Sequence, residues 1–493
     1  MKKVNARKSD PSLVWEHLLV KPSRSRDPLT VQLITSLIDA IDSKKIPKGV
    51  RLPSSRSIAK SLNIGRNTAI AAINALIERG YLASKDRSGV FVATSKEANS
   101  PAFEGVTSPS SFDWIARLGL AHSALEDASG KSPETPITHN FRYGQFDPST
   151  FPTNHWRQCE RSASGLTEIA EWGRDAFDRD DGGLIESLRK HVLPNHGIWA
   201  EADEILVTLG GQEGRYLVVQ LLSKAGVTIG FENPGLPDMN EIMATTAARC
   251  VYLPVDEDGV CLTSELKQCD VAFMMPGHHC PTTAVMPHER RLALLELAKR
   301  RDMIIVEDTY ETELLSYGKM VPSVRSLDQE GRVIHIGSLS KSVAPGLRIG
   351  FVVASPVVIK ELRAIRRLVH RHPPGNIQRA LAMFIDRGYY HSYIRQVSLT
   401  LASRTNALRQ SLNRWLPDAN VKHCEGAASF WVEFPAAVNA KELCLKMAKR
   451  GVLIESGERF FFDGDRNNYL RIAVSQIQAK EIDGGIKSIA LEM

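Results

Sequence analysis

One lysine of this chain stands among residues suited to covalent chemistry. Lys341 follows Ser338 and Ser340 and precedes Arg348. Residues 333–336, just upstream, are typical of a buried strand, so we expect Lys341 where a strand runs out into a loop. An amine there can condense with an aldehyde while the hydroxyls and the guanidinium hold a phosphate. The alternative is an ordinary solvated lysine, which the spacing and the hydroxyl neighbours disfavour.

Two further polar groups follow short apolar runs in the same way. Gly210, Gly211 and Gln212 come after one run and open a helix, whose backbone N–H groups can receive a phosphate. Asp308 follows another such run, residues 304–306, after Glu307. In a mostly parallel sheet, ligands bind beyond the carboxyl ends of the strands. The polar groups fall where such a sheet would place its binding site.

The elements that must position these residues alternate between helical and strand-like stretches. That alternation is typical of an α/β fold with a mostly parallel sheet. The predicted strands cover residues 205–208, 227–230, 271–274, 304–306, 333–336 and 351–353.

The net charge of +6 is unevenly distributed over the 493 residues. Residues 1–94 hold 17 Lys and Arg against 7 Asp and Glu, a charge of +10, which leaves −4 for the other 399 residues. A small basic head on a mildly acidic body indicates a nucleic-acid-binding module.

The head reads as three helices and a hairpin. Apolar residues recur at helical spacing from Leu29, a serine can cap a second short helix, and a third helix runs from about Arg66 to Arg79. A turn rich in Asp, Ser and Gly then joins two short strands. This order predicts a winged helix-turn-helix, whose third helix reads the major groove. The predicted DNA contacts are Arg66, Asn67 and Thr68 at base edges, and Arg56, Arg87 and the adjacent Gly89 at phosphates. A solvated basic face or a protein-docking module is the alternative.

The remaining composition bounds the class of protein. It is 43% hydrophobic, without the ~20-residue apolar run that spans a bilayer. Seven cysteines are scattered without a Cys-x-x-Cys pair, which favours reduced thiols in the cytoplasm and no zinc or other metal site. We expect a basic tail at 1–26, the winged helix at 27–94, a linker at 95–136 and a body at 137–493, whose large part is about 155–375 and small part about 376–493.

The lysine segment resembles the cofactor motif of the fold-type I pyridoxal-phosphate enzymes, the aminotransferases. The head, with Leu-Pro-Ser-Ser-Arg at 52–56 and Gly-Arg-Asn-Thr at 65–68, is similar to the GntR class of bacterial regulators. A GntR head joined to a fold-type I body resembles the MocR subfamily of transcriptional regulators. This resemblance implies a homodimer, double-stranded operator DNA as a partner, and pyridoxal 5'-phosphate as the cofactor.

The resemblance also implies roles in the body. Lys341 is the catalytic, cofactor-carrying lysine, Asp308 pairs with the protonated pyridine nitrogen, and Tyr310 reaches the ring oxygen. Ser338, Ser340 and Arg348, with residues 210–212, hold the phosphate. Arg471, on a late strand, grips the carboxylate of a small amino-compound effector. The structural alternatives are a strand-end carboxylate for Asp308, packing for Tyr310 and an ion pair for Arg471.

Two departures from the family pattern lie on the side that cradles the ring. The aromatic residue that usually follows Glu-x-Pro-Gly is Leu236, which has no π-face to stack on a ring. Residues 277–283 replace a usual Ser-His-Gln-aromatic-Pro-x-Gly, and Cys280 takes the aromatic position. These changes weigh against efficient transamination more than against cofactor binding.

The sequence therefore predicts a DNA-binding regulator whose body binds pyridoxal phosphate and senses an amine, an amino acid or the cofactor itself. Two alternatives remain open. The chain could be a working aminotransferase with a DNA-binding head, or its body could be a dimerisation scaffold that has lost the cofactor.

Overall fold

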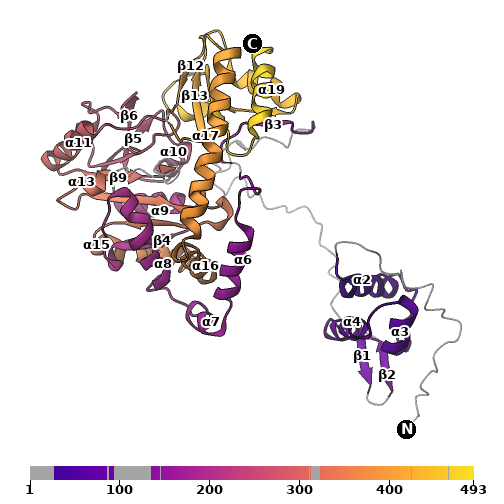
Figure 1. The fold of residues 1–493 in the computed structure, drawn as a ribbon. Helices are drawn as coiled ribbons and strands as arrows, with labels where there is room; N and C mark the ends of the chain where they lie inside the picture. Colours follow the sequence, from indigo (N-terminus) through magenta and orange to yellow (C-terminus); the bar gives the residue numbers. More distant parts are fainter. Residues whose placement is uncertain are drawn as a thin grey trace, which may run out of the picture. The chain divides into compact units, whose positions relative to one another are not determined.

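The structure is a computed structural model that describes residues 27–85, 88–93, 135–144, 146–309, 311–312, 322–423, 425–464 and 466–493. The predicted tail, most of the predicted linker, Arg87, Tyr310 and the side chain of Lys341 lie outside the described residues. The chain divides into two units, residues 1–126 and 127–493. We call the described parts of these units the head (27–93) and the body (135–493) (Figure 1).

The head has the predicted three helices and two-stranded wing. Ser54 caps the second helix by accepting a hydrogen bond from Ser57 N at 3.2 Å. Asn63 then turns the chain with a positive φ of 54°. The wing strands pair antiparallel, with Leu82 opposite Val92. The bounds are α2 Leu29–Asp42, α3 Ser55–Leu62, α4 Arg66–Glu78, β1 Leu82–Lys85 and β2 Gly89–Val92.

The buried face of α4 differs from the expected one. The spacing of apolar residues in the sequence predicts that Ile70, Ile73, Leu76 and Ile77 are buried, but Ile70 and Ile77 are only half-buried. The buried face instead includes alanines, and its members are Ala69, Ala72, Ile73 and Leu76. Small side chains on this face let the backbone of α4 approach the rest of the head closely, and the larger Ile77 packs at the side of the contact.

An eight-stranded sheet with the order β4-β11-β10-β9-β8-β5-β6-β7 forms the centre of the body. Neighbours from β10 to β6 run parallel, whereas β11 is antiparallel to both β10 and β4, and β7 is antiparallel to β6. The mostly parallel α/β sheet is therefore confirmed. Its strands are β4 Ile205–Thr208, β5 Thr228–Asn233, β6 Arg249–Asp256, β7 Gly259–Val260, β8 Val271–Met274, β9 Ile304–Asp308, β10 Val333–Ser338 and β11 Gly350–Val353.

This strand order brings distant segments to one edge of the sheet. Gly350, the first residue of β11, pairs with Ser338 at the end of β10 and with Thr208 at the end of β4. Asp308, at the end of β9, lies opposite Ile336 on β10. Because β11 runs the opposite way, its entry and its neighbours' exits meet at the same edge.

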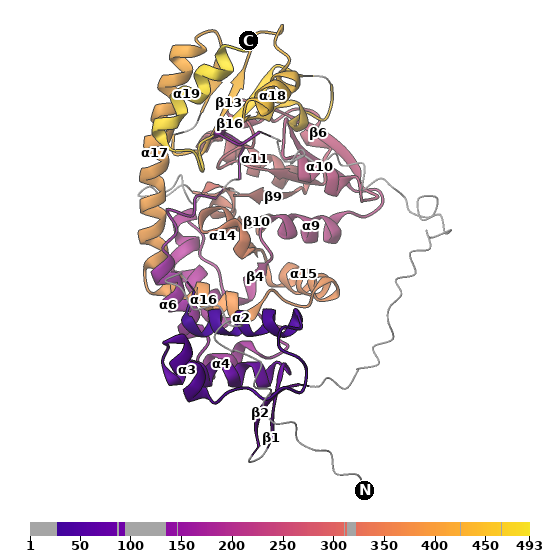
Figure 2. The same cartoon turned by 90° about the vertical axis from the view of Figure 1, so that its right-hand side faces the viewer.

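Helices cover the central sheet on both faces. Buried side chains of α9, α10 and α15 pack on one face, and those of α6, α8, α16 and α17 pack on the other. Figure 2 shows α9 and α15 on one side of the strands and α6, α16 and α17 on the other. These helices are α6 Thr153–Ala163, α8 Gly182–Ser187, α9 Gly211–Leu222, α10 Pro237–Met243, α15 Pro356–Val369, α16 Gly375–Asp386 and α17 Tyr389–Trp415.

A second, four-stranded sheet of order β12-β13-β16-β15 follows α17, and the two-residue strand β3 pairs with β14. No helix within the described ranges is both long enough and apolar enough to cross a bilayer. The remaining elements are β3 His139–Asn140, α7 Leu166–Trp172, α11 His288–Arg301, α13 Val324–Leu327, α14 Leu339–Ser342, β12 Asn420–Lys422, β13 Ser429–Glu433, α18 Ala440–Lys449, β14 Val452–Leu453, β15 Glu455–Ser456, β16 Tyr469–Ala473 and α19 Ala479–Ala490.

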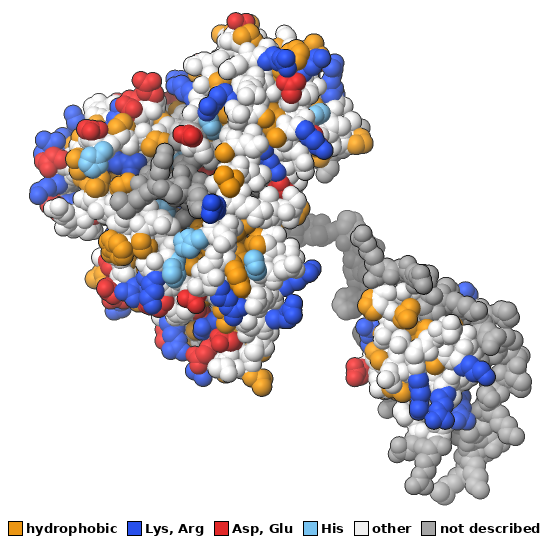
Figure 3. All heavy atoms as spheres, viewed as in Figure 1, with side chains coloured by type: hydrophobic (Ala, Val, Ile, Leu, Met, Phe, Trp, Pro, Cys, Tyr) orange, Lys and Arg blue, Asp and Glu red, His pale blue; other side chains and the backbone are white. Residues whose placement is uncertain are grey.

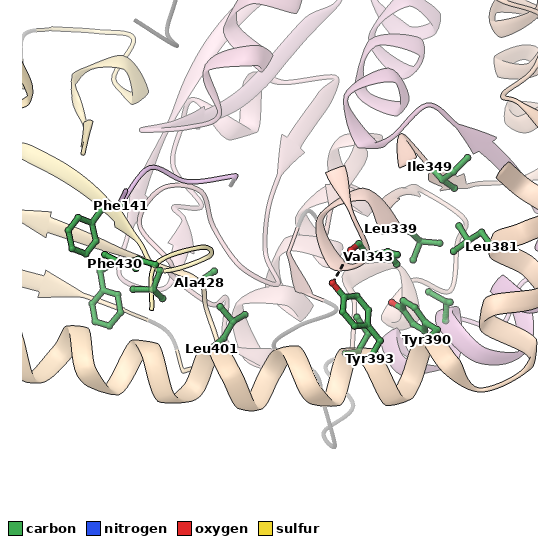
Figure 4. Close-up of a cluster of buried hydrophobic side chains, with 14 of the residues drawn as sticks. Phe141, Leu339, Val343, Ile349, Leu381, Tyr390, Tyr393, Leu401, Ala428 and Phe430 are labelled. Atoms are coloured by element: carbon green, nitrogen blue, oxygen red, sulfur yellow. Dashed lines mark hydrogen bonds between the residues drawn. The ribbon is translucent and has the colours of Figure 1, made fainter. Parts of the chain in front are cut away.

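Lys341 lies on one helical turn, α14, where we expected a loop. Val343 N donates to Leu339 O at 2.9 Å, which closes this turn. Both side chains are buried in the core beside α17 (Figure 4). Residues four positions apart lie on the same face of a helical turn, so α14 directs both side chains to the core.

Candidate functional site

A cavity of about 200 Å³ opens at the sheet edge where β4, β10 and β11 meet. Six residues that the sequence singled out line it together: Gly211, Gln212, Ser338, Ser340, Arg348 and Arg471. Its other lining residues are Tyr143, Arg215, Leu236, Pro237, Asp238, Glu455, Arg459 and Phe460.

One end of the cavity is built to receive an anion. Gly210 caps α9 with a positive φ of 80°, and a Cβ there would lie 3.3 Å from Arg348 Cζ and 3.4 Å from Ser340 Oγ. Arg348 also has a positive φ, of 50°, and donates from Nη2 to Leu209 O at 2.9 Å. A phosphate at this end would meet the first N–H groups of α9 and the guanidinium together.

The two serines differ in what their side chains do. Ser340 Oγ accepts from Ile349 N at 3.1 Å and donates to Ile349 O at 3.2 Å. This pair of bonds fastens α14 to the strand that follows Arg348. Ser338 is the N-cap of α14, lines the cavity and makes no side-chain capping bond. Ser338 is therefore the better placed hydroxyl for a phosphate, and Ser340 shapes the cradle.

Asp308 lies buried at the end of β9. Its Oδ2 accepts a hydrogen bond from Arg215 Nη1 at 2.5 Å, and both residues are less than 10% exposed. The other oxygen, Oδ1, has no hydrogen-bond partner among the described residues. A buried carboxylate oxygen without a partner is costly, so this site is suited to a ligand that brings a donor.

Sequence reasoning missed Arg215. It lies one turn after Gly211 on α9, between Gly214 and Leu217, which are buried against the sheet. A charged residue at a position that the helical period assigns to the core was the available signal.

Three other ionisable residues at this end of the site are buried: Glu232, which lines a small hollow together with Asp308, and His278 and His279. Burial raises the pKa of Glu232 well above its usual value, although Met275 N donates to its Oε2 at 2.9 Å. Burial also lowers the pKa values of His278 and His279 to about 3. His279 Nε2 lies 3.5 Å from Glu232 Oε2. The histidines are therefore neutral at pH 7.

The two departures from the family pattern lie close to this group. Leu236 lines the cavity wall, whereas Cys280 is buried and packs with Met275, Trp431 and Phe460. Neither side chain has a π-face that could stack on a ring.

Arg471 projects from the second sheet toward the same cavity. It lies on β16, opposite Trp431 on β13 and Glu455 on β15, and is 4% exposed. Its Cζ is 3.6 Å from the ring centroid of Tyr143, and its Nε donates to Ser429 Oγ at 3.4 Å. A guanidinium stacked on an aromatic ring keeps its edges available for in-plane hydrogen bonds.

In the head, the predicted DNA contacts lie on the surface. Arg56, Arg66 and Asn67 are exposed and Thr68 is half-buried. Gly65, which caps α4, has no side chain, so the first N–H groups of that helix receive no side-chain cap. On the face of the head visible in Figure 3, Lys and Arg side chains gather beside one another while acidic ones are sparse.

Arg51 is a second basic residue that the sequence reasoning missed. A Cβ on Gly89, whose φ is 106°, would come within 2.9 Å of Arg51 Nε. The guanidinium therefore lies against the wing, at a backbone position that favours glycine. Arg51 stands directly before the Leu-Pro-Ser-Ser-Arg segment, but nothing in its spacing connects it to the wing.

Comparisons with known proteins assign the two units to families. Residues 29–92 match the family described as bacterial regulatory proteins of the gntR family, and residues 178–489 match aminotransferase class I and II. The HTH-type transcriptional regulator TauR of Rhodobacter capsulatus is 36% identical over 93% of this chain and 94% of its own length. The chain belongs to the MocR-type subfamily of GntR regulators. A second relative, the probable rhizopine catabolism regulatory protein MocR of Rhizobium meliloti, is 26% identical over 94% of this chain and 93% of its own length.

Solved structures resemble the body of this MocR-type regulator. The kynurenine aminotransferase of Pyrococcus horikoshii, solved with PMP and kynurenine, has a TM-score of 0.67 at 25% identity and covers 77% of this chain and 97% of its own. The α-aminoadipate aminotransferase LysN of Thermus thermophilus has a TM-score of 0.68 at 22% identity and covers 77% of this chain and 98% of its own. The protein is a transcriptional regulator with a DNA-binding head and an aminotransferase-like body. Among the described residues, no group of His, Cys, Asp and Glu could hold a metal ion.

Proposed function

We propose that this MocR-type regulator holds pyridoxal phosphate covalently on Lys341 and changes its DNA binding when a small amino compound enters the same cavity. The observation that carries the proposal is the pairing of an anion cradle with a buried, unpartnered carboxylate oxygen, Asp308 Oδ1. These two features fit the phosphate and the protonated ring nitrogen of one flat cofactor.

The described residues of the site would have separate roles in holding the cofactor. Arg348, Ser338 and the first N–H groups of α9 would hold the phosphate, because Arg348 lies beside Gly210 and Ser338 lies beside Gly211, where α9 begins. Asp308 would accept a hydrogen bond from the ring nitrogen. When bound, the cofactor supplies an aldehyde that links reversibly to amines and a ring that withdraws electrons. Leu236 would touch the ring without stacking on it, which favours exchange of amines over turnover.

The effector would be recognised by its charge pattern. Its amine would compete with Lys341 for the cofactor, and its carboxylate would accept hydrogen bonds from Arg471. The stacking of Arg471 on Tyr143 supports this role, since it aligns the guanidinium before any ligand arrives. Tyr310, the other residue assigned to the ring, lies outside the described residues.

The head would bind operator DNA as part of a homodimer. Arg66, Asn67 and Thr68 would reach base edges from the start of α4, and Arg56, Arg87 and the wing around Gly89 would contact phosphates. As a regulator of chromosomal genes, the protein would act in the cytoplasm. Effector binding changes transcription only if it alters DNA affinity, a coupling of typically ~1–3 kcal/mol.

The visible spectrum of the full-length protein tests the proposal. Protein purified with pyridoxal phosphate should show a visible band that borohydride reduction removes, and Lys341→Ala should lack the band while retaining DNA binding. An amino-acid panel should shift the band reversibly with little keto acid released. Steady keto-acid release would instead support the aminotransferase alternative. A colourless wild-type protein, with the same spectrum as Lys341→Ala, would support the scaffold alternative.

A further inference from the structure

The ion pair between Arg215 and Asp308 sits where the proposed cofactor would place its ring nitrogen. Arg215 Nη1 is 2.5 Å from Asp308 Oδ2, and their side chains are 10% and 7% exposed. A Cβ on Gly211, at the start of α9, would lie 3.5 Å from the same Nη1. The guanidinium therefore lies between the anion cradle and the end of β9.

The surroundings of this pair are mostly apolar. A small hollow beside it is lined by Phe231, Leu236, Met239 and residues 273–275, together with Glu232 and the pair itself. Among the described residues, Glu232 is the one other ionisable residue that lines this hollow, and burial raises the pKa of its carboxyl group well above its usual value. In such surroundings a charge interacts strongly with its neighbours because little water screens it.

The carboxylate of Asp308 would therefore interact with two positive groups, the guanidinium of Arg215 and the protonated ring nitrogen of the cofactor. Arg215 already occupies Oδ2 and leaves only Oδ1 for another donor. A ring nitrogen that takes a proton from solvent and donates it toward Oδ1 would bring a second positive charge close to the guanidinium. The two cations repel, so the ring nitrogen keeps its proton less tightly than it would beside an unshared carboxylate.

We propose that Arg215 is a positioning residue that divides Asp308 between itself and the cofactor's ring nitrogen, so that the cofactor stays bound while its ring withdraws fewer electrons. This inference rests on the proposed function and deepens it. The phosphate cradle and Lys341 retain the cofactor, and Arg215 limits the proton transfers that turn binding into transamination. In this way the cation that shares Asp308 would let the regulator bind amines with little turnover.

The test follows the ring nitrogen directly. Full-length protein would be loaded with pyridoxal phosphate labelled with ¹⁵N in the ring, and the nitrogen signal would be titrated with pH. Arg215→Gln keeps an N–H donor on a shorter side chain and removes the charge, so the titration midpoint should rise by at least about one pH unit, a tenfold tighter hold on the proton. The same variant should convert its visible band with amino acids about tenfold faster, since proton transfer follows ring electron withdrawal.

Two further variants distinguish an effect of the positive charge at Arg215 from an effect of the substitution on folding. Arg215→Lys keeps the positive charge and should titrate close to the wild type. Arg325→Gln removes an arginine from another largely buried pair, with Glu204 at 3.2 Å, away from the cavity, and should leave the midpoint unchanged. If Arg215→Gln does not fold, Arg215→Lys still decides: a midpoint raised in the lysine variant means that the charge is not what matters.

The possible failures are distinguishable. If the wild type carries no visible band, the proposed cofactor itself is wrong, and Arg215 has no ring to act on. If the wild type binds the cofactor but Arg215→Gln shares its midpoint and conversion rate, only the role of Arg215 is wrong. A shift of equal size in Arg325→Gln would also overturn it, because the effect would then be a general consequence of losing a positive charge.

Discussion

Arg348 Nη2 donates to the backbone oxygen of Leu209 at 2.9 Å, and this bond joins the turn before β11 to the turn before α9. The two turns are 139 residues apart in sequence. The bond orients the guanidinium toward Gly210 before a ligand binds, so the anion cradle is pre-organised.

Substitution of Arg348 should weaken cofactor binding at the phosphate end. Arg348→Ala removes a charge-assisted contact worth about 1.5–3 kcal/mol, which corresponds to a roughly 10–100-fold higher dissociation constant for pyridoxal phosphate. Spectroscopic titration of the full-length protein measures it. The dissociation constant of Arg348→Lys should lie between those of the wild type and Arg348→Ala, because lysine keeps the positive charge but lacks the paired N–H donors of the guanidinium. Equal affinity in all three proteins would place the phosphate elsewhere.

Base reading and phosphate contact should separate in the head. Arg66→Ala should cost about 1–3 kcal/mol on the specific operator and much less on random DNA. Arg56→Ala should weaken binding to any sequence and reduce the salt slope by about one. Binding measured on both DNAs over a range of salt concentrations distinguishes these effects. An equal loss on both DNAs for Arg66→Ala would contradict base reading by this residue.

Arg51 should behave like Arg56 because of its position against the wing. Arg51→Ala should lower affinity for specific and random DNA alike and reduce the salt slope by about one. Lys44, a lysine with a positive φ of 59° at the end of α2, offers a matched control on the same domain. If Lys44→Ala reduces the slope as much, the loss reflects net charge and not a contact at the wing.

Arg471 should govern the response to the effector and not the retention of the cofactor. Arg471→Ala should keep the visible band that depends on Lys341 but need at least about tenfold more amino acid to shift it, since a charged hydrogen-bonded pair is lost. The measurement is a spectral titration with an amino acid and with the corresponding amine that lacks the carboxylate. The amine should bind wild type and variant equally. A normal amino-acid response in the variant would leave sensing of the cofactor itself as the better explanation.

The buried histidines should make the body sensitive to acid. The pKa values of His278 and His279 are about 3 in the folded protein and about 6.5 when unfolded, so the unfolded chain binds more protons between these values. Stability therefore falls as pH drops below 6.5, by about 2 kcal/mol per histidine at pH 5. The raised pKa of Glu232 acts in the opposite direction, because its folded form retains a proton that the unfolded chain releases.

Urea unfolding at pH 7 and pH 5 measures this effect. Tryptophan fluorescence reports mainly on the body, which contains five of the seven tryptophans, whereas residues 27–93 contain none. His279→Gln should lose less stability on acidification than the wild type. An unchanged difference between the two pH values would mean that His279 is already charged in the folded protein.

The sequence best predicted those features that depend on the local conformational preference of a single residue type. Strand periodicity placed Asp308 at a strand end, and the Asn63 turn and Ser54 cap followed from local turn and capping preferences. The edge where Ser338, Gly350 and Thr208 meet depends on pairing between strands far apart in sequence, which local patterns do not specify. The roles of Arg215 and Arg51 could not be predicted from the sequence for the same reason. Each acts through a partner brought close by tertiary structure, Asp308 in one case and Gly89 in the other.

The helix α17 gives the body a mechanical link between its two sheets. At 27 residues it is about 40 Å long. Near its start, Tyr393 Oη donates to Val343 O at 3.0 Å, two residues beyond Lys341 (Figure 4). Farther along, Leu401 approaches Ala428, and the helix then packs on α19. Because one helix contacts both the turn that carries Lys341 and the elements beside the second sheet, a displacement of that turn would reach the sheet that carries Arg471 through α17 and not only through the cavity.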